Sequence, residues 1–267
     1  MPKLKKVLLC QPDNFSVDYI INTLMQPHSV DKKKAMEQWQ NMAEVYRSIG
    51  IEVEVIRQPE GVPDMVFAVD HGIVKGNSVL LANMRYDQRK KESQYYRKWF
   101  IDHGYELNEL SNVNYFEGGD ARYFNEEIFL GTGYRANKES AHEMSQHLDT
   151  EVIPIEIIDP DYYHIDTSFL PINSQTAFYY PPSYSEESNK VFESKIPNLI
   201  ALNKTAAEDF AANSQISGKD IVTQSEEPEF TAALKELGMN IHVVDVSEFN
   251  KAGGGIRCMT LPLELEE

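Results

Sequence analysis

Hydrophobic positions along the chain follow a helical period in some stretches and an extended pattern in others, which predicts amphipathic helices between short strands. Residues 31–48 form the first predicted helix, which ends before Gly50 and precedes the strand 51–56. Its inner face carries Ala35, Met36, Trp39, Met42, Ala43 and Tyr46. Similar pairs of helix and strand follow at 87–102 with 105–107, 137–148 with 151–157, and 228–237 with 240–246. Less regular helices are predicted at 186–195 and 204–212, and Asn137 is the predicted N-cap of the third helix.

This recurrence predicts an α/β fold of five similar units. An open, doubly wound sheet would give a similar order of elements, so periodicity leaves both arrangements open. A closed ring is favoured because it removes exposed strand edges. The Gly131-Thr132-Gly133 segment follows a strand but lacks the third glycine of a dinucleotide-binding loop.

Composition predicts a soluble protein with a sizeable core, since 42% of the 267 residues are hydrophobic. The length fits one large domain or two small ones, and no linker divides the chain, so we expect one domain over 1–267. No apolar run approaches a membrane span, and the run after Lys6 is too short for a signal peptide. Two cysteines without a disulfide framework indicate a reducing compartment, and we expect a cytoplasmic location.

The formal net charge of −17 argues against nucleic-acid binding, which needs clustered cations. It favours a small cationic ligand, although acidity also serves solubility. The sequence predicts no membrane partner and leaves the oligomeric state open, a homo-oligomer included.

Ionisable residues and glycines gather in four short segments: 63–72, 115–120, 163–167 and 251–263. Each has an ordinary interpretation when taken alone. Glu117-Gly118-Gly119-Asp120 could be a solvated turn, His164 a core histidine, and Cys258 an inert residue of an apolar strand. The acids and histidine could also bind a metal, but the paired-histidine spacing of zinc sites is missing.

Together the four segments predict a site for a planar cation. Aspartates can hold guanidinium nitrogens with two-pronged, charge-assisted hydrogen bonds. A thiolate can attack the central carbon, and a histidine can move the protons. His164 and Asp166 alternate, so on a strand they would face the same side.

The segments Pro63-Asp64-Met65-Val66-Phe67…Asp70, Glu117-Gly118-Gly119-Asp120, His164-Ile165-Asp166-Thr167 and Gly253-Gly254-Gly255-Ile256-Arg257-Cys258 resemble the guanidino-modifying enzymes of the pentein superfamily. These include arginine deiminases, dimethylarginine dimethylaminohydrolases and amidinotransferases. The resemblance spans nearly the whole chain. It implies a five-bladed α/β propeller of ββαβ repeats around a central active site.

The same resemblance implies roles for individual residues. Cys258 would be the nucleophile of a covalent intermediate, His164 the general acid and base, and Glu117 the group that orients both the guanidinium and His164. The expected substrate-binding residues are Asp64, Asp70, Asp166, Asn22, Arg85, Arg89 and Arg135. Asp70 and Asp166 would hold guanidinium nitrogens, and the arginines would meet the α-carboxylate. No metal or organic cofactor is expected, and Cys10 is assigned to the core.

The segment 10–22 is similar to the catalytic module of bacterial arginine dihydrolases, which form ornithine, ammonia and carbon dioxide. Those enzymes usually carry Asn where this chain has Asp70, whereas arginine deiminases carry Asp. The expected reaction is therefore conversion of arginine to citrulline and ammonia. Dihydrolase, dimethylarginine dimethylaminohydrolase and amidinotransferase activities stay open as alternatives, as does a propeller that only binds.

Overall fold

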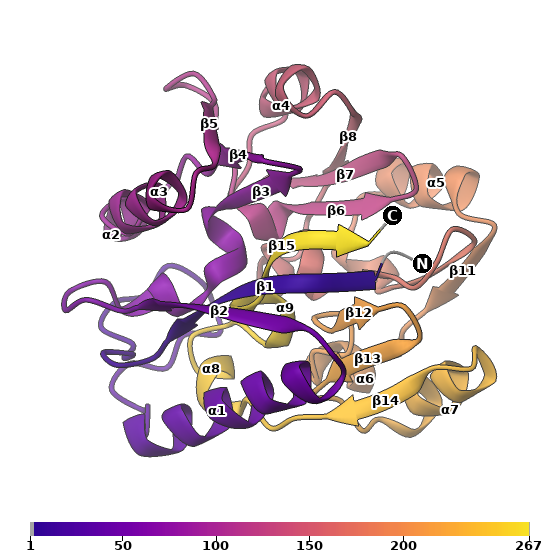
Figure 1. Cartoon of the computed structure of the whole chain (residues 1–267). Helices are drawn as coiled ribbons and strands as arrows, with labels where there is room; N and C mark the ends of the chain where they lie inside the picture. Colours follow the sequence, from indigo (N-terminus) through magenta and orange to yellow (C-terminus); the bar gives the residue numbers. More distant parts are fainter. Residues whose placement is uncertain (1–2, 267) are drawn as a thin grey trace.

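The computed structural model describes residues 3–266 and arranges their strands as five three-stranded sheets (Figure 1). In each sheet the middle strand pairs antiparallel with one neighbour and parallel with the other. The sheets, with the middle strand second, are β15 (Leu261–Glu266), β1 (Lys3–Gln11) and β2 (Glu52–Arg57); β3 (Gly72–Lys75), β4 (Ser78–Leu81) and β5 (Glu106–Glu109); β6 (Ala121–Phe124), β7 (Glu127–Thr132) and β8 (Glu151–Glu156); β9 (Phe169–Pro171), β10 (Thr176–Tyr179) and β11 (Asn198–Ala201); and β12 (Gln215–Ser217), β13 (Asp220–Thr223) and β14 (Asn240–Val243).

A helix joins the parallel pair of every sheet, because two parallel strands cannot be linked by a tight hairpin. These helices lie at the periphery of the molecule (Figure 1). They are α1 (Lys32–Ser48), α3 (Ser93–Asp102), α4 (Ser140–Leu148), α5 (Glu186–Lys195) and α7 (Pro228–Glu236). The described residues also form four shorter α-helices, α2 (Asp87–Lys90), α6 (Lys204–Glu208), α8 (Ser247–Asn250) and α9 (Ile256–Met259), and several 3-10 turns. The predicted ββαβ repeat is thus confirmed.

The inner strands β3, β6, β9, β12 and β15 all border one cavity of about 260 Å³. The five sheets are therefore arranged around a common axis, as the propeller interpretation predicted. The core is divided accordingly, with apolar clusters between each sheet and its helix. Trp39, Met42 and Tyr46 of α1 are buried as predicted, and Cys10 is fully buried in β1.

Several predicted boundaries were wrong for identifiable reasons. The helix expected over 87–102 is broken between α2 and α3, where Arg89 and Glu92 turn inward as a buried ion pair. Asn137 does not cap α4, because its Oδ1 accepts hydrogen bonds from the Tyr115 amide and the Ser140 hydroxyl.

Two elements also end earlier than the pattern indicated. The helix expected over 204–212 ends at Glu208, just before Phe210 adopts a φ of 57°. The last predicted strand of the fifth unit, 240–246, ends at Val243. Within residues 3–266, no helix has the combined length and apolarity needed to cross a membrane.

Candidate active site

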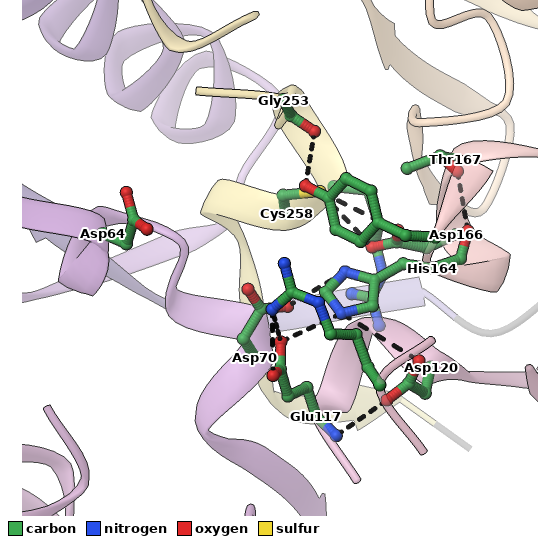
Figure 2. Close-up of polar contacts among 12 residues, drawn as sticks. Asp64, Asp70, Glu117, Asp120, His164, Asp166, Thr167, Gly253 and Cys258 are labelled. Atoms are coloured by element: carbon green, nitrogen blue, oxygen red, sulfur yellow. Dashed lines mark hydrogen bonds and ion pairs between the residues drawn. The ribbon is translucent and has the colours of Figure 1, made fainter. Parts of the chain in front are cut away.

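The candidate active site is built from five segments that each precede an inner strand. Three are 3-10 turns, one is the short helix α9, and one is a loop. These segments are Ala68–His71, Gly118–Asp120, Ile165–Thr167, Ile256–Met259 and residues 211–214. Every sheet therefore contributes side chains to the same end of the axis, and Figure 2 shows the polar contacts among them.

Cys258 lies in α9, not in the strand that the sequence suggested, because β15 begins only at Leu261. Its thiol is buried and lies 3.7 Å and 3.8 Å from the two carboxylate oxygens of Asp166. The side-chain amide of Asn213 donates a hydrogen bond to Sγ at 3.2 Å. Burial, and then the negative charge of Asp166, raise the pKa of the Cys258 thiol to about 11.

The glycines before Cys258 allow close packing around α9. A Cβ atom at Gly254 would lie 2.3 Å from a ring carbon of Phe67, and one at Gly255 would lie 2.8 Å from Oδ1 of Asn213. Gly253 has a φ of 87°, and its carbonyl accepts a hydrogen bond from the hydroxyl of Tyr163 (Figure 2). The glycine run therefore lets α9 approach both Phe67 and Asn213.

His164 is the N-cap of a 3-10 turn and Asp166 lies within that turn, so they do not share one face of a strand and the predicted local structure was wrong. Both side chains nevertheless reach the site. Nε2 of His164 lies 3.0 Å from Oε2 of Glu117, and Nδ1 lies 3.7 Å from Oδ1 of Asp70. Although burial favours the neutral imidazole, Asp70 and then Asp120 raise the pKa of His164 well above its ordinary value. Burial raises the pKa of Asp166 to about 6, against the effect of His164.

Glu117 is the best-paired acid of the site. One guanidinium nitrogen of Arg135 donates to both of its carboxylate oxygens, at 2.9 Å and 3.0 Å. Burial opposes ionisation, but Arg135, His164 and Arg89 together hold the pKa of Glu117 well below its usual range. Glu117 is therefore a fixed anion that can orient His164 and stabilise its charged form.

Gly119 brings the opposite walls of the site together. A Cβ atom at this position would lie 2.7 Å from Nδ1 of His164 and 2.8 Å from Oδ1 of Asp70. Asp120 accepts a hydrogen bond from the Glu117 amide and faces Nε2 of His164 at 4.0 Å. Its burial raises its pKa well above the usual range. The Glu-Gly-Gly-Asp segment is thus a buried turn within the site, not the solvated turn that its composition also allowed.

The three predicted arginines lie in different environments. Arg89 is buried and donates to Asp70 at 2.6 Å and to Glu92 at 2.9 Å, so it is committed to protein carboxylates. Arg135 is buried between the rings of Tyr86 and Tyr163, and one of its nitrogens binds Glu117. Arg85 is exposed and donates to the carbonyls of residues 133 and 134.

Asp64 and Asn22 lie outside the central group. Asp64 is buried, but it lies apart from the other labelled acids in Figure 2, and its Oδ1 accepts no hydrogen bond within residues 3–266. Burial raises its pKa to about 7, although Arg89 opposes the shift. Asn22 donates to the Ala252 carbonyl and accepts from the Leu24 amide, so it holds backbone next to Gly253.

Sequence reasoning missed Asn213, which lies at the centre of the site. Besides its bond to the thiol, it donates to the Asp166 carbonyl at 3.1 Å and accepts from the amides of Arg257 and Cys258. It is fully buried. The available signal was its place two residues before β12, which corresponds to the place of Asp70 before β3.

Asp70, Glu117 and His164 could in principle share a metal, since one ligand atom from each lies within 4.8 Å of the others. The donor set fits poorly. Arg89 already binds Asp70, and Arg135 already binds both oxygens of Glu117. Two guanidinium groups so close would also repel a divalent cation.

Several buried polar atoms in or beside the site have no hydrogen-bond partner within the described residues. They are Oδ1 of Asp70, of Asp120 and of the more distant Asp64, together with Nδ1 of His164, which carries an N–H group when the imidazole is charged. Unpaired buried polar atoms are costly, and ionised carboxylates accept but do not donate. A planar cation with several N–H donors would match the unpaired oxygen of Asp70 and the carboxylate of Asp166 beside the Cys258 thiol.

Comparison with known proteins supports one family. The model of the eukaryotic N,N dimethylarginine dimethylhydrolase family matches residues 9–265. The bifunctional arginine dihydrolase/ornithine cyclodeaminase ArgZ of Synechocystis sp. is 33% identical over 96% of this chain, which spans only 37% of that relative. The N(G),N(G)-dimethylarginine dimethylaminohydrolase of Mycobacterium tuberculosis is 30% identical, over 98% of this chain and 87% of that relative.

The fold matches a solved structure equally closely. A substituted form of the N-terminal domain of ArgZ, covalently bound to a reaction intermediate, superposes with a TM-score of 0.94. The match covers 97% of each chain at 32% identity. The five sheets described above are therefore the architecture of that enzyme domain as well.

Proposed function

Because this chain belongs to the N,N dimethylarginine dimethylhydrolase family of the pentein superfamily, we propose that it hydrolyses the guanidino group of L-arginine to citrulline and ammonia. Family membership confirms the resemblance of the four motifs and makes the protein a guanidino-group hydrolase. The substrate, the product and the roles of individual residues are the proposal. We also propose that the whole span 1–267 is one catalytic domain, since all five sheets supply residues to one site.

The observation that supports this reaction best is the meeting of Cys258 with two separate aspartates. Asp166 lies against the thiol, and Asp70 lies across from it beside His164. Two carboxylates can each accept N–H groups from a different guanidinium nitrogen. The substrate's positive charge would also counter the burial and the Asp166 charge that keep the thiol protonated, so the thiolate would form once the guanidinium is bound.

The steps follow from these positions. The Cys258 thiolate forms a bond to the guanidinium carbon, and the C–N bond to one terminal nitrogen breaks after that nitrogen takes a proton from His164. Ammonia leaves, and His164 then accepts a proton from water as the water oxygen attacks the same carbon. The C–S bond breaks and regenerates the thiolate, and the protonated urea group releases its extra proton to water to give citrulline. Glu117 orients His164 through Nε2 and stabilises its charged form throughout.

Arg135 is the best candidate for holding the substrate's α-carboxylate. Only one of its terminal nitrogens binds Glu117, and its other N–H groups make no hydrogen bond to the described residues. Arg85 lies nearby at the solvent side and donates to the backbone of residues 133 and 134. Arg89 takes a different role from the predicted one, since it holds Asp70 and Glu92 in place.

Arginine is a better substrate candidate than dimethylarginine because methyl groups donate no hydrogen bonds. If one guanidinium nitrogen carried two methyl groups, it would have no N–H group to donate. The aspartate facing that nitrogen would then lack its hydrogen bonds. Dihydrolase activity is the second candidate, and the similarity to ArgZ favours it. Asp70 argues for a single hydrolysis, since the dihydrolases that the sequence resembles usually carry Asn there.

A product assay tests the proposal. Wild type, Cys258→Ser and the core control Cys10→Ala are incubated with L-arginine, and ammonia, citrulline and ornithine are quantified by mass spectrometry. We expect one ammonia and one citrulline per arginine from wild type and Cys10→Ala, and none from Cys258→Ser. Ornithine with two ammonia would contradict the single hydrolysis. Faster turnover of dimethylarginine, or product only when an amine acceptor is added, would replace the proposed substrate or reaction.

A further inference from the structure

Two arginines lie behind the active site, at the cavity that the five inner strands enclose. Arg122 is in β6, and Arg257 directly precedes Cys258 in α9. The active-site segments precede the inner strands in the chain and lie at one end of the axis. The cavity extends along the inner strands to their opposite ends, where Val74, Phe124 and Leu265 line it. We call this space the axial cavity. It is distinct from the substrate-binding side and reaches the surface at Tyr123, which is 40% exposed.

The guanidinium of Arg122 has no hydrogen-bond or ion-pair partner among the described residues. The residue is only 7% exposed, yet its side chain makes no hydrogen bond or ion pair with any residue in 3–266. Arg257 donates to the Gln215 side chain at 3.0 Å and to the Thr260 carbonyl at 3.2 Å, but its Nε is buried without an acceptor. Burial, and then the charge of Arg257, lower the pKa of Arg122 to about 9.

The axial cavity has the opposite charge from the rest of the protein. The formal net charge of the chain is −17, but none of the described residues that line the cavity is acidic. Two mostly buried guanidinium groups that line one cavity are costly to desolvate and repel each other, and the charge of Asp166, outside the cavity lining, offsets this only in part, because burial lowers the pKa of both arginines. An anion placed between them would offset both effects, and a carboxylate fits the planar guanidinium fork.

The remaining lining indicates which kind of anion would fit. Most of it is apolar, and a few amide and hydroxyl groups stand near the strand ends. The apolar lining residues include Ile73, Val74, Phe124, Ile172, Leu261 and Leu265, and the polar ones are Asn125, Asn173, Ser174 and Gln215. A volume of about 260 Å³ is large enough for several waters, and hence for an acid of roughly six to eight heavy atoms.

We propose that the axial cavity is a binding site for a small organic carboxylate, whose charged end is held by Arg122 and Arg257 and whose apolar end packs on the inner strands. Such an anion would also act on the nucleophile, because both arginines interact electrostatically with Cys258 and Asp166. An anion that neutralises the two arginines weakens the positive potential at the thiol and so disfavours the thiolate. Occupancy therefore slows reaction at Cys258.

Titration calorimetry with sodium butyrate tests the site, with sodium phosphate as the second anion and sodium chloride holding the ionic strength constant. The variants are Arg122→Gln, Arg122→Lys, which keeps the charge, and the exposed control Arg57→Gln. We expect saturable butyrate binding to wild type and Arg57→Gln, binding at least tenfold weaker in Arg122→Gln, and partial recovery in Arg122→Lys. Binding of equal strength in Arg122→Gln would overturn the proposal, because an anion in the substrate-binding site would behave that way.

A second measurement uses only the wild-type protein, so it tests the proposal even if Arg122→Gln does not fold. The rate of Cys258 alkylation by iodoacetamide is followed at fixed pH and ionic strength as butyrate is added. We expect a saturable decrease of at least threefold, at the concentration range found by calorimetry. An unchanged rate together with no binding heat, or binding of phosphate but not butyrate, would overturn the assignment to a carboxylate.

Discussion

The Sγ atom of Cys258 lies 3.7 Å from Oδ2 of Asp166, so the thiol is held against a carboxylate. This contact helps to keep the thiol protonated in the free protein, since burial and Asp166 both raise its pKa. A cationic substrate that binds between the two would reverse the effect. The arrangement therefore couples formation of the thiolate to arrival of a guanidinium.

Asp166→Asn should increase the reactivity of the thiol in the absence of substrate. Removing the negative charge lowers the pKa of Cys258, and each unit corresponds to about tenfold more thiolate below that pKa. Alkylation at pH 8, followed by mass spectrometry of the Cys258 peptide, should become about tenfold faster. The exposed control Asp161→Asn should leave the rate unchanged. An equal or slower rate in Asp166→Asn would contradict the proposed effect of this carboxylate, although the same variant should lose turnover of arginine.

Asn213→Ala should reduce activity more than its loss of stability explains. Asn213 fixes the Cys258 and Arg257 amides and contacts the thiol, so truncation frees α9 to move. We expect a tenfold to hundredfold lower kcat and a loss of about 1–3 kcal/mol in unfolding free energy. Asn203→Ala, which removes the N-cap of α6 at a cost of about 1 kcal/mol, is the matched control. Equal kcat values for the two variants would show that Asn213 only stabilises the fold.

Gly119→Ala should abolish most activity without a special backbone angle being involved. The added Cβ would lie 2.7 Å from His164 Nδ1 and 2.8 Å from Asp70 Oδ1, so one of these groups must move. We expect kcat/KM for arginine to fall by at least about a hundredfold. Gly104→Ala serves as the control, because its φ of 79° is strained for alanine but its Cβ meets no atom within 4 Å. Loss of stability with unchanged kinetics is expected there, and similar kinetics in both variants would exclude the steric explanation.

Asp64→Asn should make the protein more stable at pH 8. The folded protein raises the pKa of Asp64 to about 7, mainly through burial. The folded state therefore binds this proton more tightly than the unfolded state, and stability falls as pH rises from about 4 towards 7. Replacing the carboxylate with a neutral amide should increase the free energy of unfolding by about 1–3 kcal/mol above pH 7. Below pH 4 the increase should be small. Denaturant unfolding at several pH values, with the exposed Glu60→Gln as control, checks this dependence. A gain that is constant with pH would point to packing instead.

The sequence predicted the repeating units well because the connecting helices carry periodic apolar faces, and three of them are followed by a glycine, at Gly50, Gly104 and Gly238. It predicted the site less completely, since the segments before the inner strands are too short to show any period. The helix around Cys258 and the turn around His164 were therefore taken for strands.

Buried polar residues were the second feature that the sequence did not predict. Arg89 stands at the start of a predicted helix, where charged side chains usually meet solvent, yet it is buried against Asp70 and Glu92. Asn213 is an uncharged residue that follows two alanines, so its only signal is its place two residues before an inner strand, which the sequence pattern does not reveal. Both depend on packing between sheets that are distant in the chain.

The pairing of β1 with β15 affects co-translational folding of the enzyme. β1 emerges first among the described strands, but one of its two neighbours, β15, emerges last and directly follows the helix that carries Cys258 (Figure 1). The edge of β1 that pairs with β15 therefore stays unpaired while the other four sheets are synthesised. When β15 docks, the same event completes the first sheet and fixes the end of α9, which carries the proposed nucleophile Cys258. We therefore expect completion of the fold and onset of activity to coincide.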